Sequence, residues 1–243
     1  MVQVTAPTVQ ECRSCGGGAP VDVHFCPQCT KILTLSRHGD YFAFLGVPRK
    51  LNLDVAELEG KFRTLSRQFH PDYFYNASLA ERRASLERSS YLNDAYRTLR
   101  QPASRIEYLL EMEGRGGRGG QPGGGPGGRA GHESHVPPAL LEEVFALNEE
   151  LDEVRALREA GAPESEWRGR LQRARRPIDA KQAEHEHDLT TLSARWDGLV
   201  DAGAGIVERQ AVLKALQERM LERNYITNLL AGIERELAGT SDL

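Results

Sequence analysis

The sequence lacks a long apolar run, a strong charge of one sign and a recognisable targeting segment. No stretch approaches the roughly 20 apolar residues that span a bilayer, and the formal net charge of -4 gives no drive toward nucleic acid or an anionic membrane. The first ten residues have neither the basic and apolar blocks of a secretory signal nor the arginine of a transit peptide. We therefore expect a cytoplasmic protein without nucleic acid or membrane among its partners.

Cysteine is missing after position 29, whereas four cysteines cluster before it. They are Cys12, Cys15, Cys26 and Cys29. Disulfide scaffolds spread their cysteines through the fold, so this clustering favours a metal site in a reducing compartment. Two Cys-x-x-Cys pairs supply the four thiolates of a tetrahedral zinc site. Iron in a rubredoxin-like site remains an alternative, whereas a thioredoxin-like redox pair would need βαβ surroundings that the sequence does not predict.

Apolar residues are nearly absent from the segment between Gly114 and Gly131, which consists mostly of glycine with some arginine and proline. Such a segment cannot bury enough apolar surface to offset its chain entropy, which predicts a flexible linker. The sequence therefore divides into a cysteine module (8–35), a first helical domain (38–113), a linker (114–136) and a second helical domain (137–240).

The first helical domain carries two apolar stripes separated by a proline. A capping box followed by apolar residues at helical spacing predicts a helix over 54–69. Pro71 cannot continue that helix, and a polar loop leads to a second helix around 92–99, which makes an αα-hairpin. A leading helix over 41–46 and a short final helix that begins at Pro102 complete the domain.

The second helical domain is rich in charge and poor in turn signals. Gly161 and Gly203 mark turns that separate three predicted helices. The middle helix, about 164–200, contains Pro177, which predicts a kink or a break. Three helices with short connections predict an antiparallel bundle. The expected fold class is therefore mainly α, with a small tetracysteine zinc-knuckle module, a helical hairpin and a C-terminal antiparallel three-helix bundle.

The tripeptide His70-Pro71-Asp72 lies at the tip of the predicted hairpin, after a helix that carries Lys61 and Arg67. This arrangement resembles a J domain, a family that docks on ATP-bound DnaK-type chaperones and stimulates their ATP hydrolysis. The resemblance implies that Pro71 fixes the loop, that His70 packs beside it, and that Asp72 offers its carboxylate to a basic groove. It also implies that Lys61 and Arg67 face an acidic chaperone surface. The residues alone leave open a plain helix-breaking turn, or a His–Asp pair that would need a pocket and a third partner.

A longer pattern resembles the HscB family, the J-domain co-chaperones of iron–sulphur cluster assembly. It comprises Leu65-x-Arg67-Gln68-Phe69-His70-Pro71-Asp72-x-Phe74, Leu92-Asn93-x-Ala95-Tyr96-x-x-Leu99, Pro102-x-x-Arg105-x-x-Tyr108-Leu109-Leu110 and, less specifically, 148–153. A cysteine module before the J domain also occurs in some members. Two features depart from the family pattern: Tyr73 stands where lysine is common, and the Gly-rich segment replaces a compact connection.

In this family the C-terminal bundle binds the scaffold protein IscU and delivers it to the chaperone HscA. The resemblance therefore implies a scaffold-binding surface on the second helical domain. Its residues would be Leu141, Phe145, Glu149, Glu153 and Tyr225. The first four lie four residues apart, so apolar residues come first and carboxylates follow, which suits a partner with an apolar patch beside basic groups. Bundle packing is the alternative for Leu141 and Tyr225, and ordinary solvation is the alternative for the two glutamates.

These observations predict a co-chaperone rather than an enzyme, with zinc as its structural metal and iron as the alternative. The predicted partners are an HscA- or DnaK-type chaperone and an IscU-type scaffold protein. Two other hypotheses remain: a general J-domain protein that binds unfolded clients, and a tetracysteine iron or redox protein. The sequence leaves open whether the cysteine module serves folding, self-association or contact with a partner.

Overall fold

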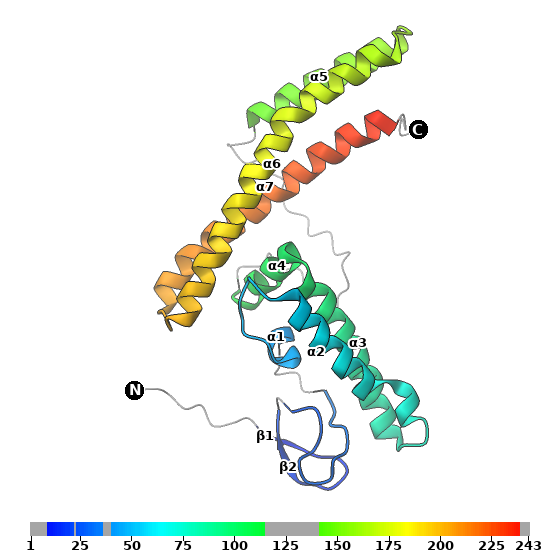
Figure 1. The fold of residues 1–243 in the computed structure, drawn as a ribbon, viewed down its shortest axis with the longest axis vertical. Coiled ribbons are helices and arrows are strands. Elements are labelled where there is room, and N and C mark those ends of the chain that lie inside the picture. The colour runs from blue at the N-terminus through cyan, green and yellow to red at the C-terminus, as the bar shows by residue number, and fades with distance from the viewer. Residues whose placement is uncertain (1–8, 22, 36–39, 115–140, 239–243) are drawn as a thin grey trace. The chain divides into compact units, whose positions relative to one another are not determined.

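The computed structural model of the protein describes residues 9–21, 23–35, 40–114 and 141–238. The chain divides into two compact units, Met1–Leu109 and Leu110–Leu243. Helices dominate both, and a small sheet accompanies the cysteines (Figure 1). The mainly α fold class with a small cysteine module is therefore confirmed. The predicted linker lies outside the described residues, apart from Gly114.

The sheet holds the first two cysteines at one end of a hairpin. Strand β1 (Val9–Glu11) pairs antiparallel with strand β2 (Gly18–Pro20), and Gln10 lies opposite Ala19. The side chain of Ala19 is fully buried. An isolated antiparallel bridge flanks the second pair of cysteines in the same way.

Both Cys-x-x-Cys segments form turns of the same construction. The amide of Gly16 donates to the carbonyl of Cys12 at 2.8 Å, and the amide of Thr30 donates to the carbonyl of Cys26 at 2.9 Å. Gly16 and Thr30 each follow the second cysteine of a pair, and both have a positive φ, 71° and 60°. A left-handed residue is thus needed to close each turn, which explains the glycine at the first position.

The rest of the first unit is helical. The elements are α1 (Tyr41–Leu45), α2 (Val55–Phe69), the 3-10 turn η1 (Pro71–Phe74), α3 (Leu79–Arg100) and α4 (Pro102–Met112), and the boundary between the units falls within α4. Helix α3 packs against both α1 and α2. The predicted αα-hairpin is therefore formed by α2 and α3, with α1 covering it.

Side-chain caps fix where these helices begin. Asp40 and Asp54 accept backbone amides in the first turns of α1 and α2. Ser78 and Glu81 form a reciprocal capping box at the start of α3. These polar side chains satisfy amides that have no partner within their own helix.

Helix α3 begins at Leu79, whereas the sequence suggested a polar loop up to about residue 92. The first half of α3 exposes most of its side chains and buries only a narrow inward stripe. Because that stripe contains Ser85 and Arg88 beside Ala84, the apolar periodicity that identifies an amphipathic helix is masked.

The core of the first unit lies between its helices. Its fully or almost fully buried apolar side chains are Phe42, Leu58, Phe69, Leu92, Ala95, Leu99 and Leu109. Arg105 is buried beside them, and its guanidinium donates to the carbonyls of Leu51 and Leu99, the latter at 2.7 Å. This cation supplies a hydrogen-bond donor to a carbonyl in the last turn of α3 and connects that turn to the segment before α2.

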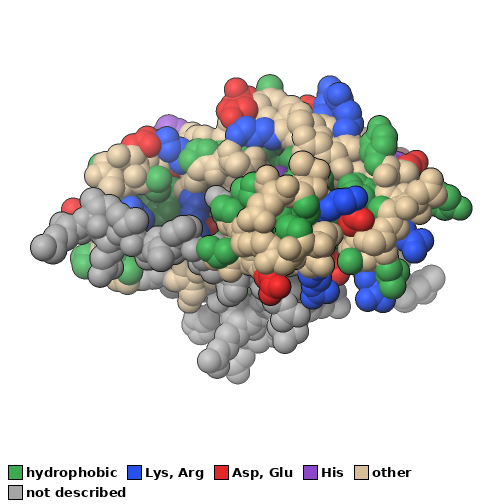
Figure 2. Space-filling model, turned by 90° about the horizontal axis from the view of Figure 1, so that it is seen from below, with side chains coloured by type: hydrophobic (Ala, Val, Ile, Leu, Met, Phe, Trp, Pro, Cys, Tyr) green, Lys and Arg blue, Asp and Glu red, His purple; other side chains and the backbone are tan. Residues whose placement is uncertain are grey.

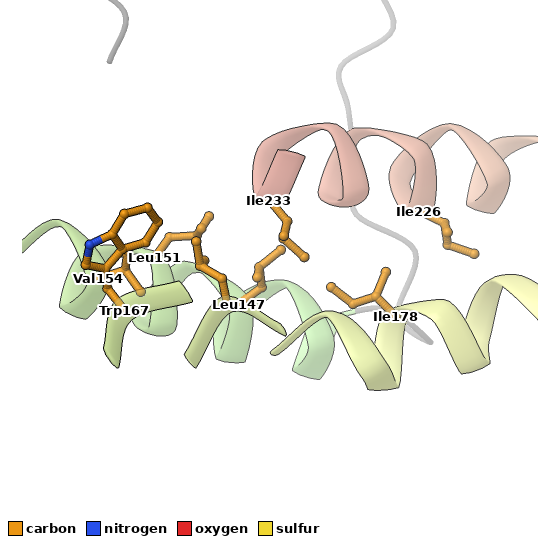
Figure 3. Packing of buried hydrophobic residues seen from close by; sticks show 8 residues of the cluster. Leu147, Leu151, Val154, Trp167, Ile178, Ile226 and Ile233 are labelled. Carbon is orange, nitrogen blue, oxygen red and sulfur yellow. The ribbon is translucent and has the colours of Figure 1, made fainter. Parts of the chain in front are cut away.

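The second unit contains, within the described residues, α5 (Leu141–Glu159), α6 (Glu164–Asp201) and α7 (Ile206–Ala238). Figure 3 shows apolar side chains of all three helices pointing toward one another. The buried members of this cluster are Leu147, Leu151, Val154, Trp167, Leu171, Ile178, Ile226 and Ile233. These residues form the three-helix core that the sequence predicts.

The three-helix arrangement occupies only part of the second unit. Helix α5 has 19 residues and α6 has 38, so α5 spans about half of α6 at 1.5 Å per residue. Beyond α5, helices α6 and α7 continue as a pair (Figure 1). Trp196, Leu213 and Leu216 are buried in that part.

Helix α6 continues through Pro177, so the predicted break does not occur. The proline ring removes one amide donor toward the carbonyl of Arg173 and crowds that carbonyl. Leu171 and Ile178 are buried on either side of the proline. Their packing against the neighbouring helices holds α6 in a helical path despite the missing hydrogen bond.

No helix in the described part of the chain is long and apolar enough to cross a membrane. On the face drawn in Figure 2, basic and acidic side chains are interspersed. Interspersed charges give little long-range attraction for a partner of one sign. On this face, charge complementarity to a partner therefore depends on small local groups of residues.

Candidate functional site

The four cysteine sulphurs converge, with all Sγ atoms within 4.8 Å of one another. Cys12 Sγ lies 3.6 Å from Cys29 Sγ, and Cys15 Sγ lies 3.8 Å from Cys26 Sγ. These separations are too long for disulfide bonds of about 2.05 Å. They match a zinc tetrahedron, in which bonds of about 2.3 Å place the sulphurs about 3.8 Å apart. The donor set therefore fits a zinc ion.

The thiols of this cluster differ in acidity. The backbone amide of Cys29 lowers the pKa of Cys26 to about 7, although burial opposes the change. The backbone amide of Lys31 lowers the pKa of Cys29, but burial and the neighbouring thiols outweigh it and raise the pKa to about 12. A metal ion must displace protons from such thiols, so its affinity rises with pH.

The tripeptide His70-Pro71-Asp72 forms an ordered turn between α2 and α3. Pro71 opens the 3-10 turn η1, and the amide of Asp72 donates to Nδ1 of His70 at 3.3 Å. The amide of Tyr73 donates to the carbonyl of His70 at 3.0 Å. The side chains of His70 and Asp72 are 52% and 86% exposed. The turn therefore presents a carboxylate to solvent in a fixed local geometry.

Exposed aromatic rings follow the tripeptide. Tyr73 and Tyr75 are 74% and 77% exposed, and the ring of Tyr73 lies edge-on to that of His70 with centroids 6.1 Å apart. The position where the family commonly has lysine thus carries an aromatic side chain beside the histidine. Any partner that docks on this loop meets apolar as well as acidic groups.

Lys61 and Arg67 lie on different sides of α2, because six residues along an α-helix correspond to about 120°. Lys61 donates to the carbonyl of Gly46 and pairs with Glu57 at 3.1 Å, so it ties α2 to the end of α1. Arg67 is exposed about one turn before His70. The structure therefore brings Arg67, and not Lys61, close to the tripeptide.

The cysteine module packs on the end of α2 that leads into the tripeptide. The ring of His24 lies edge-on to Phe44 and Phe69, with centroids 4.8 and 5.0 Å apart. The ring of Phe25 lies 6.0 Å from that of Phe69. Since Phe69 immediately precedes His70, the module touches the upstream end of the loop.

Arg88 of α3 is the buried cation at this contact. Its guanidinium donates to the carbonyls of Leu33 and Thr34 at 2.7 and 3.2 Å, and to Nδ1 of His24 at 2.7 Å. Because arginine has no acceptor, Nδ1 of His24 must accept, which places the ring hydrogen on Nε2. Burial lowers the pKa of Arg88 to about 10, so the side chain is still charged at neutral pH.

A second contact between the module and the helices reaches the downstream end of the loop. Lys31 Nζ lies 3.1 Å from one carboxylate oxygen of Glu81. The other oxygen accepts from the amide and hydroxyl of Ser78, at 3.2 and 2.9 Å. Burial raises the pKa of Glu81, but the hydrogen bonds from Lys31 and Ser78 outweigh burial and hold the pKa below its ordinary value.

Sequence reasoning missed the contacts of His24, Lys31, Glu81 and Arg88. The signal that pointed to one of them is the spacing in α3, where Arg88 stands four residues before Leu92 on the buried stripe. A charged residue on such a stripe indicates buried acceptors nearby. The sequence does not reveal that these acceptors are carbonyls of the cysteine module.

Four of the five residues predicted to bind a scaffold protein lie along α5. Leu141 and Phe145 are 40% and 69% exposed, and Glu149 is exposed. Glu153 forms an ion pair with Arg170 of α6. This stripe is therefore apolar at its start and acidic further on, with part of the acidic charge paired within the unit.

Tyr225 of α7 has a different environment from those four residues. It is half-buried and packs against the three-helix core cluster. Its hydroxyl is buried without a hydrogen-bond partner. This environment favours the packing alternative for Tyr225.

A groove of about 740 Å³ lies between α5 and α7. Its lining includes Leu147, Leu151 and Leu229 together with Arg155 and Arg235. Arg155 is engaged with the carboxylate of Glu236 at 3.0 Å. The groove is thus lined by both apolar and charged side chains.

The fold is similar to that of two solved chaperone structures, although no protein-family model matches the chain. The crystal structure of the human co-chaperone protein HscB matches with a TM-score of 0.64 and 25% identity, covering 95% of this chain and 100% of the human chain. The chaperone HscB from Vibrio cholerae matches with a TM-score of 0.53 and 26% identity, covering 83% of this chain and 99% of that one. The predicted likeness to the HscB family is therefore confirmed.

Proposed function

We propose that this chain, which is structurally similar to the HscB co-chaperones, stimulates ATP hydrolysis by a DnaK- or HscA-type chaperone and delivers an IscU-type scaffold protein to it. The chain makes and breaks no covalent bond in this role. It acts by binding one chaperone state better than another, which shifts the population toward the state that hydrolyses ATP quickly.

The observation that carries this proposal is the geometry of the tripeptide loop. Asp72 is held in a short turn, in which its amide donates to Nδ1 of His70, yet its side chain is 86% exposed. A fixed and solvent-facing anion suits a basic groove on a partner, because little conformational freedom is lost on docking. Arg67 lies next to this loop and supplies the opposite charge for an acidic surface.

The surface of α5 supports the second half of the proposal. Phe145 is a large apolar side chain with 69% of its surface exposed, on the same stripe as Leu141 and the carboxylates of Glu149 and Glu153. An exposed aromatic side chain beside charges is typical of a protein–protein contact. The two tasks therefore fall on different units: chaperone activation on the first and scaffold binding on the second.

We further propose that Cys12, Cys15, Cys26 and Cys29 hold a structural zinc ion. The closed set of four sulphurs leaves no open coordination position, as in structural rather than catalytic zinc sites. Metal analysis of the purified protein tests this assignment: about one zinc per chain is expected, whereas stoichiometric iron with thiolate absorption bands contradicts it.

The decisive experiment measures steady-state ATP hydrolysis by the cognate chaperone with this protein, in the absence and presence of the scaffold protein. Stimulation that rises further with the scaffold supports both halves of the proposal. Stimulation that is indifferent to the scaffold overturns the delivery role and leaves a general J-domain function. Absence of stimulation overturns the co-chaperone function itself.

Replacement of Asp72 by asparagine is expected to reduce the stimulation by about 30-fold or more, because a buried charge pair with the chaperone is lost. Helix content and scaffold binding should stay unchanged, since the side chain is exposed. Asp179→Asn on the surface of α6 is the matched control and should leave stimulation intact. Full stimulation by Asp72→Asn contradicts the proposed mechanism.

A further inference from the structure

We infer that the cysteine module is a clamp that positions the His-Pro-Asp loop, and that bound metal keeps this clamp closed. The clamp consists of residues 24–34 and their contacts with Phe69, Glu81 and Arg88. The inference rests on the proposed function, because it gives the module a part in presenting Asp72 to the chaperone. It extends that function to a segment whose role the sequence left open.

The upstream end of the loop is held through Phe69. The rings of His24 and Phe25 pack on the ring of this residue. Its carbonyl accepts hydrogen bonds from the hydroxyls of Ser85 and Ser89 of α3, at 2.6 and 2.9 Å. Phe69 is therefore held through its ring by the module and through its carbonyl by α3. The next residue in the chain begins the tripeptide.

The downstream end of the loop is held through Glu81. This carboxylate completes the capping box that starts α3 at Ser78, and Lys31 of the module pairs with it at 3.1 Å. The carboxylate has 10% of its surface exposed, so the pair is screened less than an exposed ion pair. The module thus reaches both ends of the loop that contains Asp72.

Arg88 binds the module and also packs on Phe69, so it reinforces the upstream contact. Its guanidinium binds Leu33, Thr34 and His24 of the module, and its Cζ atom lies 5.9 and 5.8 Å from the ring centroids of Phe44 and Phe69. A buried guanidinium with three acceptors is costly to leave unpaired, because the charge and the carbonyls would all lose their partners. The clamp and the hairpin are therefore expected to stay docked together or to separate as a whole.

The metal matters because the cysteine module has only a small core of its own. The buried apolar side chains that pack within the module are Cys12, Ala19, Cys26 and Leu33. So small a core does not stabilise a fold of about 30 residues without a metal or a disulfide. Because Cys26 and Cys29 lie inside the clamp, loss of the metal releases the segment that carries His24 and Lys31.

The test compares hydrogen exchange in the full chain when it is loaded with zinc and after a chelator has removed the metal. The amides in the last turn of α2 (66–69) and the first turns of α3 (82–86) are expected to exchange about tenfold faster without metal. The amides of α7 should not change, because that helix belongs to the second unit. Unchanged exchange in 66–69 and 82–86, with the amides of the module itself exposed, overturns the clamp.

Two substitutions test the clamp with the metal in place. Arg88→Lys keeps the charge and the stem but cannot reach three acceptors in the fork geometry of a guanidinium. Lys31→Met removes only the pair with Glu81 and leaves the metal ligands and the core untouched, so it stays informative if the first variant fails to fold. Lys214→Met, on the exposed surface of α7, is the matched control. The two clamp variants should accelerate exchange at the loop ends, and the control should not.

The same samples separate this inference from the proposed function. With the clamp open, the protein concentration that gives half-maximal chaperone stimulation should rise about tenfold, while maximal stimulation and scaffold affinity stay the same. Absence of chaperone stimulation by the zinc-loaded protein refutes the proposed function. In that case the hydrogen-exchange data still show whether the metal-bound module holds the ends of the loop. Equal half-maximal concentrations with and without metal refute the clamp alone.

Discussion

Buried arginines join segments of the first unit that are far apart in the sequence. Arg88 donates to the carbonyl of Leu33, 55 positions away, and Arg105 donates to the carbonyl of Leu51, 54 positions away. Each guanidinium has a rigid array of donors that several carbonyls can share. Loss of either side chain would leave buried carbonyls without a donor, which costs about 1–3 kcal/mol for each unsatisfied group. At the scale of single residues, these two cations connect the cysteine module to α3, and the segment before α2 to α4.

Replacement of Glu81 by glutamine is expected to lower the free energy of unfolding of the first unit by about 1 kcal/mol at pH 7, because the cap of α3 and the pair with Lys31 both weaken. The folded-state pKa of Glu81 is below its ordinary value, so its ionised form contributes stability above the unfolded pKa of about 4.3. That contribution disappears as the pH falls through the folded pKa. The difference between the two proteins should therefore shrink in acid.

Denaturant unfolding between pH 3 and pH 7 measures this difference. Glu87→Gln, on the exposed side of the same helix, is the control and should change stability by less than about 0.5 kcal/mol. A stability difference for Glu81→Gln that stays constant across this pH range contradicts the role given to its charge.

Helix α6 illustrates how packing overrides a local signal at the scale of one element. Pro177 lies inside the helix, where the ring removes a hydrogen bond and clashes with the preceding turn. The helix nevertheless continues for 38 residues, because its apolar face is buried against α5 on one part and against α7 along its length. Tertiary contacts thus outweigh a penalty that would end an isolated helix.

Substitution of Pro177 by alanine is expected to stabilise the second unit by about 1–3 kcal/mol, because it restores the hydrogen bond to the carbonyl of Arg173 and relieves the clash. Thermal unfolding followed by circular dichroism measures the gain. Arg176→Ala, at the neighbouring exposed position, should change stability by less than about 0.5 kcal/mol. A loss of stability in Pro177→Ala would show that the helix depends on a bend at this position.

At the scale of the whole molecule, the proposed function assigns its two tasks to two different units. The tripeptide, the cysteine cluster and the contacts that join them lie in the first unit, whereas the exposed stripe on α5 lies in the second. Each unit has its own buried core. Changes in one site are therefore expected to leave the intrinsic binding property of the other unchanged, because each unit folds around a core of its own.

Phe145→Ser is expected to weaken scaffold binding by about tenfold, because a large apolar contact is lost. It should leave unfolding unchanged within about 0.5 kcal/mol, since the side chain is 69% exposed. Asp72→Asn should have the reverse profile, with normal scaffold affinity and lost stimulation. Isothermal titration with the scaffold protein and the ATPase measurement in its absence read the two properties separately.

The double variant completes this experiment. If the units act independently, its scaffold affinity equals that of Phe145→Ser and its chaperone stimulation equals that of Asp72→Asn. A scaffold affinity that also depends on Asp72 would indicate coupling between the units in the free protein.

Several features could be predicted from the sequence because they depend on neighbouring residues. The spacing of four cysteines predicts their convergence, and Pro71 predicts the end of α2. Asp54 predicts where α2 begins. The start of α3 was missed because serine and arginine occupy its inward face. The continuity of α6 was missed because the proline signal is local and the packing that overrides it is not.

The sequence by itself determined the number of long helices in each helical domain, the convergence of the four cysteines and the turn at the tripeptide, since caps, periodicity and residue spacing act over a few residues. Only the tertiary structure decided that the cysteine module packs on both ends of the tripeptide loop. The contacts responsible join Lys31 to Glu81 and Leu33 to Arg88 across 50 or more positions. The partner of a charged side chain cannot be identified from the helical pattern around it. A guanidinium or carboxylate meets its acceptor or donor only after distant segments have folded together.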